Sequence, residues 1–266
     1  MFDLPRLSVD VDVNYVGAVQ RNEFEEERPK VEQAVQAVCS RESLSVAGMP
    51  GDHAGGKWRL RYESALGGGG NLELDLNFLF RVPLWPVVSR DSRKVGSYRA
   101  AGIPVLDMHE LAAGKLVALL ARRASRDLFD AHMLLTRGEL DIEKLRLGFV
   151  LYGAMNRKDW REVRPGDVEF DAREIEAQLV PLVRGGFLGK DGKSKGWAAR
   201  LVRECRQKLD VVLPLYANER EFLDGILDNA EIKPELLTAD EAMRERIKVH
   251  PLLQWKALNV RRHKGI

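Results

Sequence analysis

The chain has 266 residues, of which 45% are apolar and 31% are charged, and its formal net charge is only +2. These values exclude a disordered tail and a broadly basic nucleic-acid coat, and they allow one or two globular domains with a substantial core. The two cysteines, Cys39 and Cys205, form no Cys-x-x-Cys pair, which is typical of reduced thiols in a cytoplasmic protein. No apolar run approaches the roughly 18–20 residues that span a bilayer, and the N-terminus does not read as a signal peptide, so we expect no membrane contact.

The first element is predicted at residues 7–15, where apolar and polar residues alternate strictly. One face of this half-buried strand carries Ser8, Asp10, Asp12 and Asn14. Two carboxylates this close repel each other unless a cation lies between them, and hard oxygen ligands select Mg²⁺ or Mn²⁺. The alternative is an edge strand with solvated surface acids, because Asp-x-Asp is a common string.

A helix predicted over residues 23–38 has an acidic first turn, which suits the positive end of a helix dipole. Residues 57–64 and 71–80 then alternate on either side of the glycine run 67–70, which predicts a β-hairpin. Neither Lys-Ser/Thr nor a helix follows the glycines, so a plain turn is favoured over a phosphate-binding loop.

The second strand of this hairpin carries Glu73, Asp75 and Asn77 on one face. If it lies beside the first strand, Asp75 completes a three-carboxylate cluster with Asp10 and Asp12. Clusters of this kind hold two metals for phosphoryl or nucleotidyl transfer.

A short strand is predicted near residues 103–106, and beyond it the pattern becomes helical. The predicted helices cover residues 107–123, 126–136, 141–157, 171–184, 197–210, 217–228, 239–249 and 251–260. The sequence therefore predicts an α+β protein with an α/β domain over residues 1–105 and a helical domain over residues 106–266.

The first of these helices begins at Asp107, a capping residue, with Glu110 at the capping-box position. Lys115, Arg122 and Arg126 follow at positions i, i+7 and i+11, so one continuous helix would align them in a cationic stripe suited to a triphosphate. The alternative is a solvated charged face.

The string Ser125-Arg126-Asp127 indicates a break in this helix and the start of another. Asp127 and Asp130 lie three residues apart, so both fall on one side of the second helix. Either of them pairs with Arg126 or Arg123, or completes an active site.

Four strings together resemble the AbiEii/AbiGii-type toxin family, and the resemblance extends over nearly the whole chain. They are Pro-Arg-Leu-Ser-Val-Asp-Val-Asp-Val-Asn (5–14), Glu-Leu-Asp-Leu-Asn (73–77), Glu-Leu-Ala-Ala-Gly-Lys-Leu (110–116) and Arg-Asp-Leu-Phe-Asp (126–130). This family belongs to the nucleotidyltransferase superfamily, so the resemblance implies a polymerase-β-like core, with a mixed sheet and helices, followed by a helical domain.

The resemblance also implies roles for particular residues. Asp10 and Asp12 would bind metal, with Asp75 as the third carboxylate, and Lys115 would contact the nucleotide triphosphate. Asp127 or Asp130 would be the further acidic residue, with Asp127 preferred as catalytic. We assign Ser8, Arg126 and Asp130 to substrate binding.

The function implied is that of a toxin of a toxin–antitoxin pair that transfers a nucleotide from an NTP, either GTP or a pyrimidine NTP. The acceptor implied is the 3′ end of a tRNA, and the partner is a cognate antitoxin. The Lys- and Arg-rich segment 184–208 is either a solvated surface or a contact with RNA phosphates.

The sequence departs from the family pattern in one respect, because no Gly-Gly-Ser/Thr turn precedes the Asp-x-Asp strand. This predicts a chain without its first elements, or a degenerate member that binds nucleotide or antitoxin without turnover. Protein AMPylation or kinase chemistry on the same core is a third, weaker alternative.

Overall fold

The computed structural model describes residues 4–8, 10–51, 54–122, 124–188 and 194–265, with only the backbone of residues 194 and 195. Contacts group the chain into two compact units, and each is described by itself. Unit 1 comprises Met1–Leu7, Leu84–Lys248 and Leu253–Ile266, and unit 2 comprises Ser8–Pro83 and Val249–Leu252. Residues 84–105, which the sequence analysis assigns to the α/β domain, group with the helices in this division, and the boundary near residue 105 stays a prediction.

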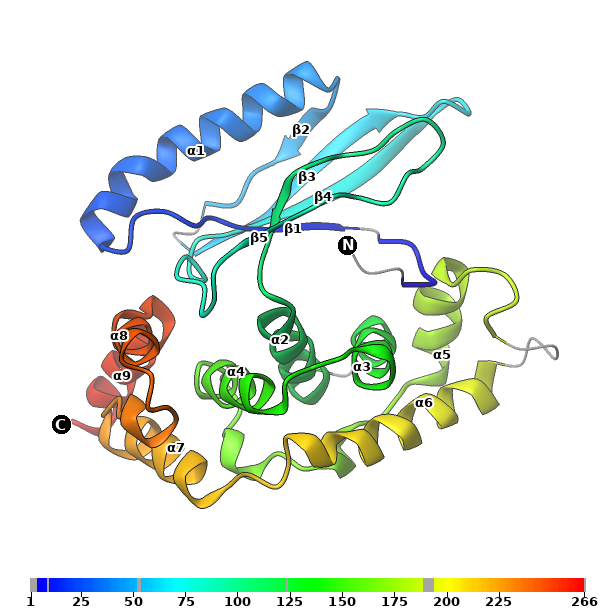
Figure 1. The fold of residues 1–266 in the computed structure, drawn as a ribbon. Coiled ribbons are helices and arrows are strands. Elements are labelled where there is room, and N and C mark those ends of the chain that lie inside the picture. Colours follow the sequence, from blue (N-terminus) through cyan, green and yellow to red (C-terminus); the bar gives the residue numbers. More distant parts are fainter. Residues whose placement is uncertain (1–3, 9, 52–53, 123, 189–193, 266) are drawn as a thin grey trace. The chain divides into compact units, whose positions relative to one another are not determined.

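Unit 2 is built on a four-stranded mixed sheet with the order β1-β4-β3-β2 (Figure 1). Its strands are β1 (Asp10–Asn14), β2 (Ser45–Gly48), β3 (Gly55–Glu63) and β4 (Gly69–Asn77). β1 runs parallel to β4, whereas β4, β3 and β2 are antiparallel. The parallel pair requires a long crossover, and helix α1 (Arg21–Arg41) lies within it.

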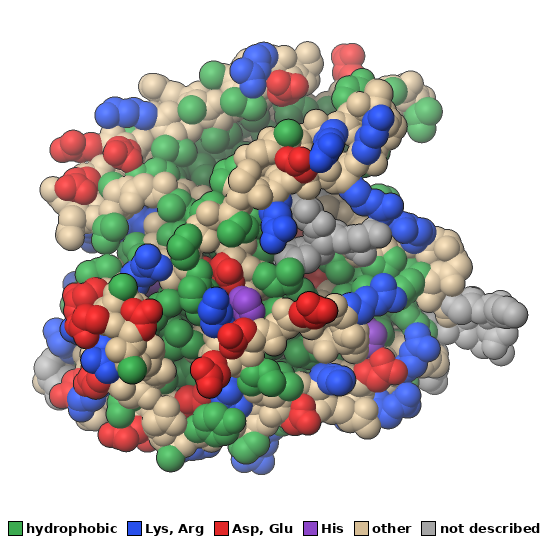
Figure 2. Space-filling view, in the orientation of Figure 1, with side chains coloured by type: hydrophobic (Ala, Val, Ile, Leu, Met, Phe, Trp, Pro, Cys, Tyr) green, Lys and Arg blue, Asp and Glu red, His purple; other side chains and the backbone are tan. Residues whose placement is uncertain are grey.

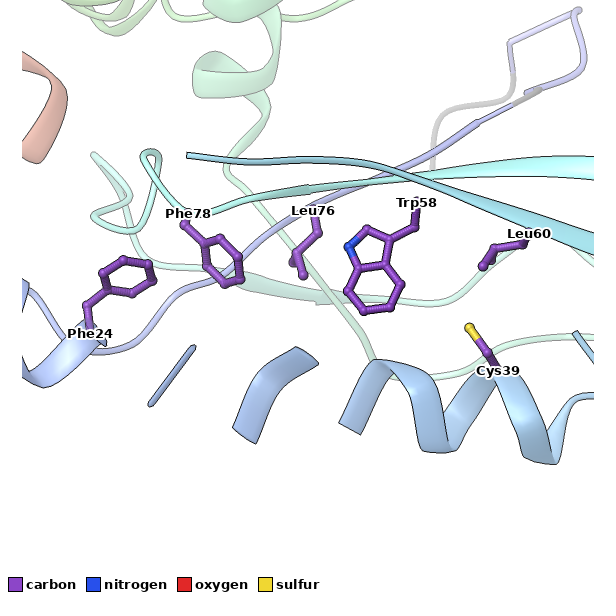
Figure 3. Packing of buried hydrophobic residues seen from close by; sticks show 6 residues of the cluster. All are labelled: Phe24, Cys39, Trp58, Leu60, Leu76 and Phe78. Carbon is purple, nitrogen blue, oxygen red and sulfur yellow. The ribbon is translucent and has the colours of Figure 1, made fainter. Parts of the chain in front are cut away.

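The core of unit 2 lies between α1 and one face of this sheet (Figure 3). Alternation along β3 and β4 directs their apolar side chains to that face, as the sequence predicts. The buried residues are Phe24, Cys39, Trp58, Leu60, Leu76 and Phe78. The opposite face is therefore left to the polar residues of the same strands.

Unit 1 is mainly helical, with a small two-stranded sheet of β5 (Val88–Arg90) and β6 (Ile103–Val105). Its longer helices are α2 (Met108–Ala121), α3 (Ser125–Arg137), α4 (Ile142–Ala154), α6 (Ser194–Lys208), α7 (Ala217–Asn229), α8 (Glu241–Val249) and α9 (Pro251–Lys264). Within unit 1, α2 packs against both α3 and α4, and α3 also packs against α6. The chain is thus α+β, as predicted.

One predicted helix, over residues 171–184, is wrong as a single element. The structure has a three-residue helix α5 (Ala172–Glu174), a π-helical turn η3 (Ile175–Leu179) and a 3₁₀ turn η4 (Val180–Leu182). Pro181 lies inside η4, and because its nitrogen cannot donate a helical hydrogen bond, a regular helix does not continue through it.

On the face drawn in Figure 2, acidic and basic side chains are intermixed, in keeping with the small net charge. Among the described residues, no helix is long and apolar enough to cross a membrane.

Candidate functional site

The polar face of the unit 2 sheet gathers the carboxylates that the sequence analysis singles out. β1 and β4 pair in parallel register, with Asp10 opposite Glu73 and Asp12 opposite Asp75. Residues opposite each other on neighbouring strands point to the same face, and the strands lie about 4.8 Å apart. The sheet therefore brings Asp75 beside the Asp-x-Asp pair. We call these four acids the carboxylate face.

Lys57 of β3 lies opposite Asp75 on the same face. Its Nζ donates to Oε2 of Glu73 at 2.6 Å, and this hydrogen bond raises the pKa of Lys57. The pKa of Asp75 is raised, first by burial and then by the negative charge of Asp12, while Lys57 lowers it. Repulsion among the acids thus outweighs the nearby lysine.

A divalent cation would relieve this repulsion, because its charge favours the ionised form of every acid beside it. The ligand chemistry fits Mg²⁺ or Mn²⁺, which prefer carboxylate oxygens. As the side chains stand, however, no group of three or more His, Cys, Asp or Glu in the described part of the chain is positioned to hold a metal ion. The carboxylate face therefore fits a cation in charge and ligand type, and the metal assignment stays a prediction.

Ser8 lies two residues before Asp10 and is exposed. Its Oγ donates to the backbone oxygen of Asp10 at 3.1 Å. The hydroxyl thus lies beside the start of β1, and its assignment to substrate binding stays a prediction.

In unit 1, Asp130 joins two cations from distant parts of the chain. Nε and Nη2 of Arg6 donate to its two carboxylate oxygens at 2.7 and 2.6 Å, and Nζ of Lys115 lies 3.1 Å from Oδ2. The Asp130 side chain is 3% exposed and that of Lys115 is 38% exposed. Lys115 is therefore held by a buried acid while its side chain stays partly exposed. We call Arg6, Lys115 and Asp130 the basic triad.

The other predicted acid, Asp127, has a different partner. Nε of Arg122 donates to its Oδ2 at 2.6 Å, and the Arg122 side chain is 67% exposed. The geometry thus joins Asp130, rather than Asp127, to Lys115. Neither the Arg6–Asp130 pair nor the Arg122–Asp127 pair involves Arg126, and Arg123 lies outside the described residues.

The predicted cationic stripe is wrong, whereas the predicted break is confirmed. Helix α2 ends at Ala121, Arg122 has extended backbone angles, and α3 begins at Ser125. Because the helix does not continue, the 100° spacing that would align Lys115 with Arg122 and Arg126 is lost. Arg126, in the first turn of α3, is partly buried.

Glu110 does not form the predicted capping box. The Asp107 side chain does cap α2, accepting the backbone N–H of His109 at 2.8 Å. Glu110 is instead buried, accepting the backbone N–H of Leu84 at 3.0 Å and the hydroxyl of Tyr152 at 2.7 Å. Burial raises its pKa. Its role is to hold the chain before α2 against α4.

A hollow of about 760 Å³ in unit 1 is lined by arginines and acids and by none of the predicted site residues. Its central cation, Arg161, is paired with Asp159, Asp224 and Asp228 at 2.5–2.9 Å. These carboxylates raise the pKa of Arg161. Because these charges neutralise each other, we interpret the ion pairs at the hollow as structural and not as a binding site.

Comparison with known proteins identifies the family. Residues 1–225 match the model of AbiEii, described as the nucleotidyl transferase AbiEii toxin of type IV toxin–antitoxin systems. The chain belongs to the AbiEii family. Membership implies a nucleotide as substrate and an antitoxin as partner, and nucleotidyltransferases of this family generally use divalent metals.

Among solved structures, the chain is similar to the MenT4 nucleotidyltransferase toxin from Mycobacterium tuberculosis H37Rv. The two are 18% identical with a TM-score of 0.47, over 79% of this chain and 67% of that chain. No curated protein matches the chain in sequence.

Sequence reasoning missed two residues that lie beside predicted site residues, Lys57 opposite Asp75 and Arg6 paired with Asp130. Lys57 could have been found, because the hairpin turn fixes the register that brings it opposite Asp75. Arg6 could not, because it lies 124 residues from Asp130 and no spacing rule connects them.

Proposed function

We propose that the protein transfers a nucleotide from an NTP to an acceptor hydroxyl. The observation that carries this proposal is the carboxylate face, where Asp12 and Asp75 lie opposite each other in register and repel each other. Asp10, Asp12 and Asp75 would hold two Mg²⁺ or Mn²⁺ ions. When bound, such ions polarise the α-phosphate and activate the acceptor hydroxyl.

The chain's own residues bind and orient the reactants. The acceptor oxygen bonds to the α-phosphorus as the bond to the β-phosphate breaks, and pyrophosphate leaves while the hydroxyl proton is released. Lys115 binds the triphosphate and, with Arg126, neutralises charge that develops on the pyrophosphate. Asp130 positions Lys115, and Ser8 contributes to substrate binding. Asp127 is retained as a further acidic residue of the site.

The proposed acceptor is the 3′ end of a tRNA, and the proposed donor is GTP or a pyrimidine NTP. Helix α6 supports a polyanionic acceptor, because it carries Arg200, Arg203, Arg206 and Lys208 against a single acid, Glu204, among its described side chains. A cognate antitoxin would restrain this activity in the cytoplasm.

The test is incorporation of labelled NTPs into tRNA with Mg²⁺ or Mn²⁺ present. Asp12→Asn removes one ligand charge without changing side-chain shape, so incorporation should fall by at least about a thousandfold. Glu63→Gln is the matched control, because Glu63 is an exposed acid at the far end of β3 and should leave incorporation intact. Unchanged labelling by Asp12→Asn would refute the site.

A second candidate is a member that binds nucleotide or antitoxin without turnover. It is favoured by the finding that the acids, as they stand among the described residues, form no metal-binding group of three. Equilibrium binding of labelled NTP separates the two: binding without incorporation into RNA or protein supports this candidate.

A further inference from the structure

The segment that connects β5 with β6 forms an exposed arm within unit 1. We define the arm as residues 88–105, which run away from the helices of unit 1 in Figure 1. Between residues 89 and 102, every residue but Ser92 is exposed. A two-stranded ribbon without a packed face has little stability from burial, so its order must come from local hydrogen bonds.

Those bonds are present at both ends of the ribbon. At its base, the Asp91 carboxylate accepts the backbone N–H of Gly102 at 2.9 Å and pairs with Arg99 at 2.5 Å. These two contacts lower the pKa of Asp91, in that order. Ser92 and Ala100 are joined both by a backbone bond of 2.7 Å and by the Ser92 Oγ.

At its tip, Val95 and Tyr98 exchange both backbone hydrogen bonds, at 2.9 and 3.0 Å. Gly96 takes the first position of this two-residue turn with φ +61, a conformation that glycine adopts without strain. Residues paired in this way across a ribbon share a face. The turn thus presents Val95 and Tyr98 together, and they are 75% and 82% exposed.

The charge of the arm is one-sided. It carries four cations, Arg90, Arg93, Lys94 and Arg99, and one acid, Asp91. An exposed aromatic ring with cations around it favours a nucleic acid as ligand. The ring can stack on a base, and the cations can bind the phosphates of the nucleic-acid backbone. The apolar surface at the tip consists of only two side chains, and its area is too small for a stable protein–protein interface.

We propose that the arm binds single-stranded RNA, with Tyr98 stacking on an unpaired base of the acceptor. The proposal rests on the proposed function, since it concerns how the acceptor is held and not how the nucleotide is transferred. The hydrogen bonds that order the arm favour this role, because a backbone that is already ordered loses little entropy on binding.

The test measures fluorescence anisotropy of two labelled RNA stem-loops, one with an unpaired 3′ end and one blunt. Tyr98→Ala should weaken binding of the first by about tenfold and leave the second unchanged, as expected for loss of one stacked base. Lys94→Ala should weaken both and reduce the salt dependence by about one phosphate contact. Tyr62→Ala is the control, because Tyr62 is 42% exposed on β3 and lies outside the arm.

Tyr98→Ala and Lys94→Ala leave the carboxylate face intact, so both variants should bind NTP like the wild type. A failure of the arm is then distinguishable from a failure of the proposed function. Equal affinity of Tyr98→Ala and wild type for the unpaired end, or no binding of either RNA by the wild type, would overturn the proposal. A variant that keeps RNA affinity but loses the cognate antitoxin would assign the arm to a protein partner and also overturn it.

Discussion

The basic triad and the carboxylate face differ in the charges that surround their acids. In the basic triad of unit 1, one buried acid, Asp130, is met by two cations at hydrogen-bond distance. On the carboxylate face of unit 2, Asp10, Asp12, Glu73 and Asp75 share one side of a sheet, and the nearby Lys57 does not offset their repulsion on Asp75.

This difference indicates what each group needs. A buried acid with two bound cations is complete within the protein, and removing it leaves charge behind without a partner. A row of acids in which the neighbouring charges help to raise the pKa of Asp75 is incomplete, and a bound cation would stabilise it. The same substitution, aspartate to asparagine, should therefore have opposite effects on stability in the two places.

The largest effect is expected for Asp130→Asn. It removes the charge that neutralises Arg6, whose side chain is only 11% exposed, so the free energy of unfolding should fall by about 2–3 kcal/mol. Urea unfolding measures this. Asp127→Asn provides the comparison: its partner Arg122 is largely exposed, and the loss should be about 1 kcal/mol or less. Equal losses would show that Asp130 is not the more strongly held acid.

A smaller effect of opposite sign is expected for Asp75→Asn without metal. Because the pKa of Asp75 is raised above 3.8, the folded state holds its proton to a higher pH than the unfolded chain does. Stability therefore falls as pH rises through the window between the two values, and the ionised acid destabilises the protein at pH 7. The partly exposed acid is screened by solvent, so the substitution should stabilise by less than about 1 kcal/mol.

Mg²⁺ should make the wild type more stable than Asp75→Asn, which reverses the order expected without metal. At ten times its dissociation constant it would add about 1.4 kcal/mol to the wild type and much less to Asp75→Asn. Urea unfolding at pH 4 to 8, with and without Mg²⁺, follows both effects. If Asp75→Asn is less stable than the wild type at pH 7 without metal, the claim that the ionised Asp75 destabilises the carboxylate face is contradicted.

Much of the fold follows from local patterns in the sequence. Alternation over residues 7–15 predicts the polar face of β1, and the glycine run predicts the β3–β4 hairpin. Of the three short strands only β6 was predicted; β2 and β5, with four and three residues, give little periodic signal and were missed. The helix predicted over residues 171–184 failed because Pro181 outweighs the apolar spacing.

The candidate site was predictable only where it depends on one strand or one turn. Asp10 and Asp12 share a face by strand geometry alone. Placing Asp75 beside them requires the order of the strands in the sheet, which the sequence analysis could only assume. The pairing of Arg6 with Asp130 is tertiary. It depends on residues 5–7 pairing with residues 182–184, which no local pattern specifies.

The most direct test of the carboxylate face is a Mn²⁺ titration followed by electron paramagnetic resonance, in which free Mn²⁺ loses its signal on binding. With a non-hydrolysable NTP analogue present, the wild type and Glu63→Gln should bind Mn²⁺, and Asp12→Asn and Asp75→Asn should lose at least about tenfold in affinity. Equal Mn²⁺ binding by wild type and Asp12→Asn, or no binding by the wild type, would contradict the claim that these acids hold the metal.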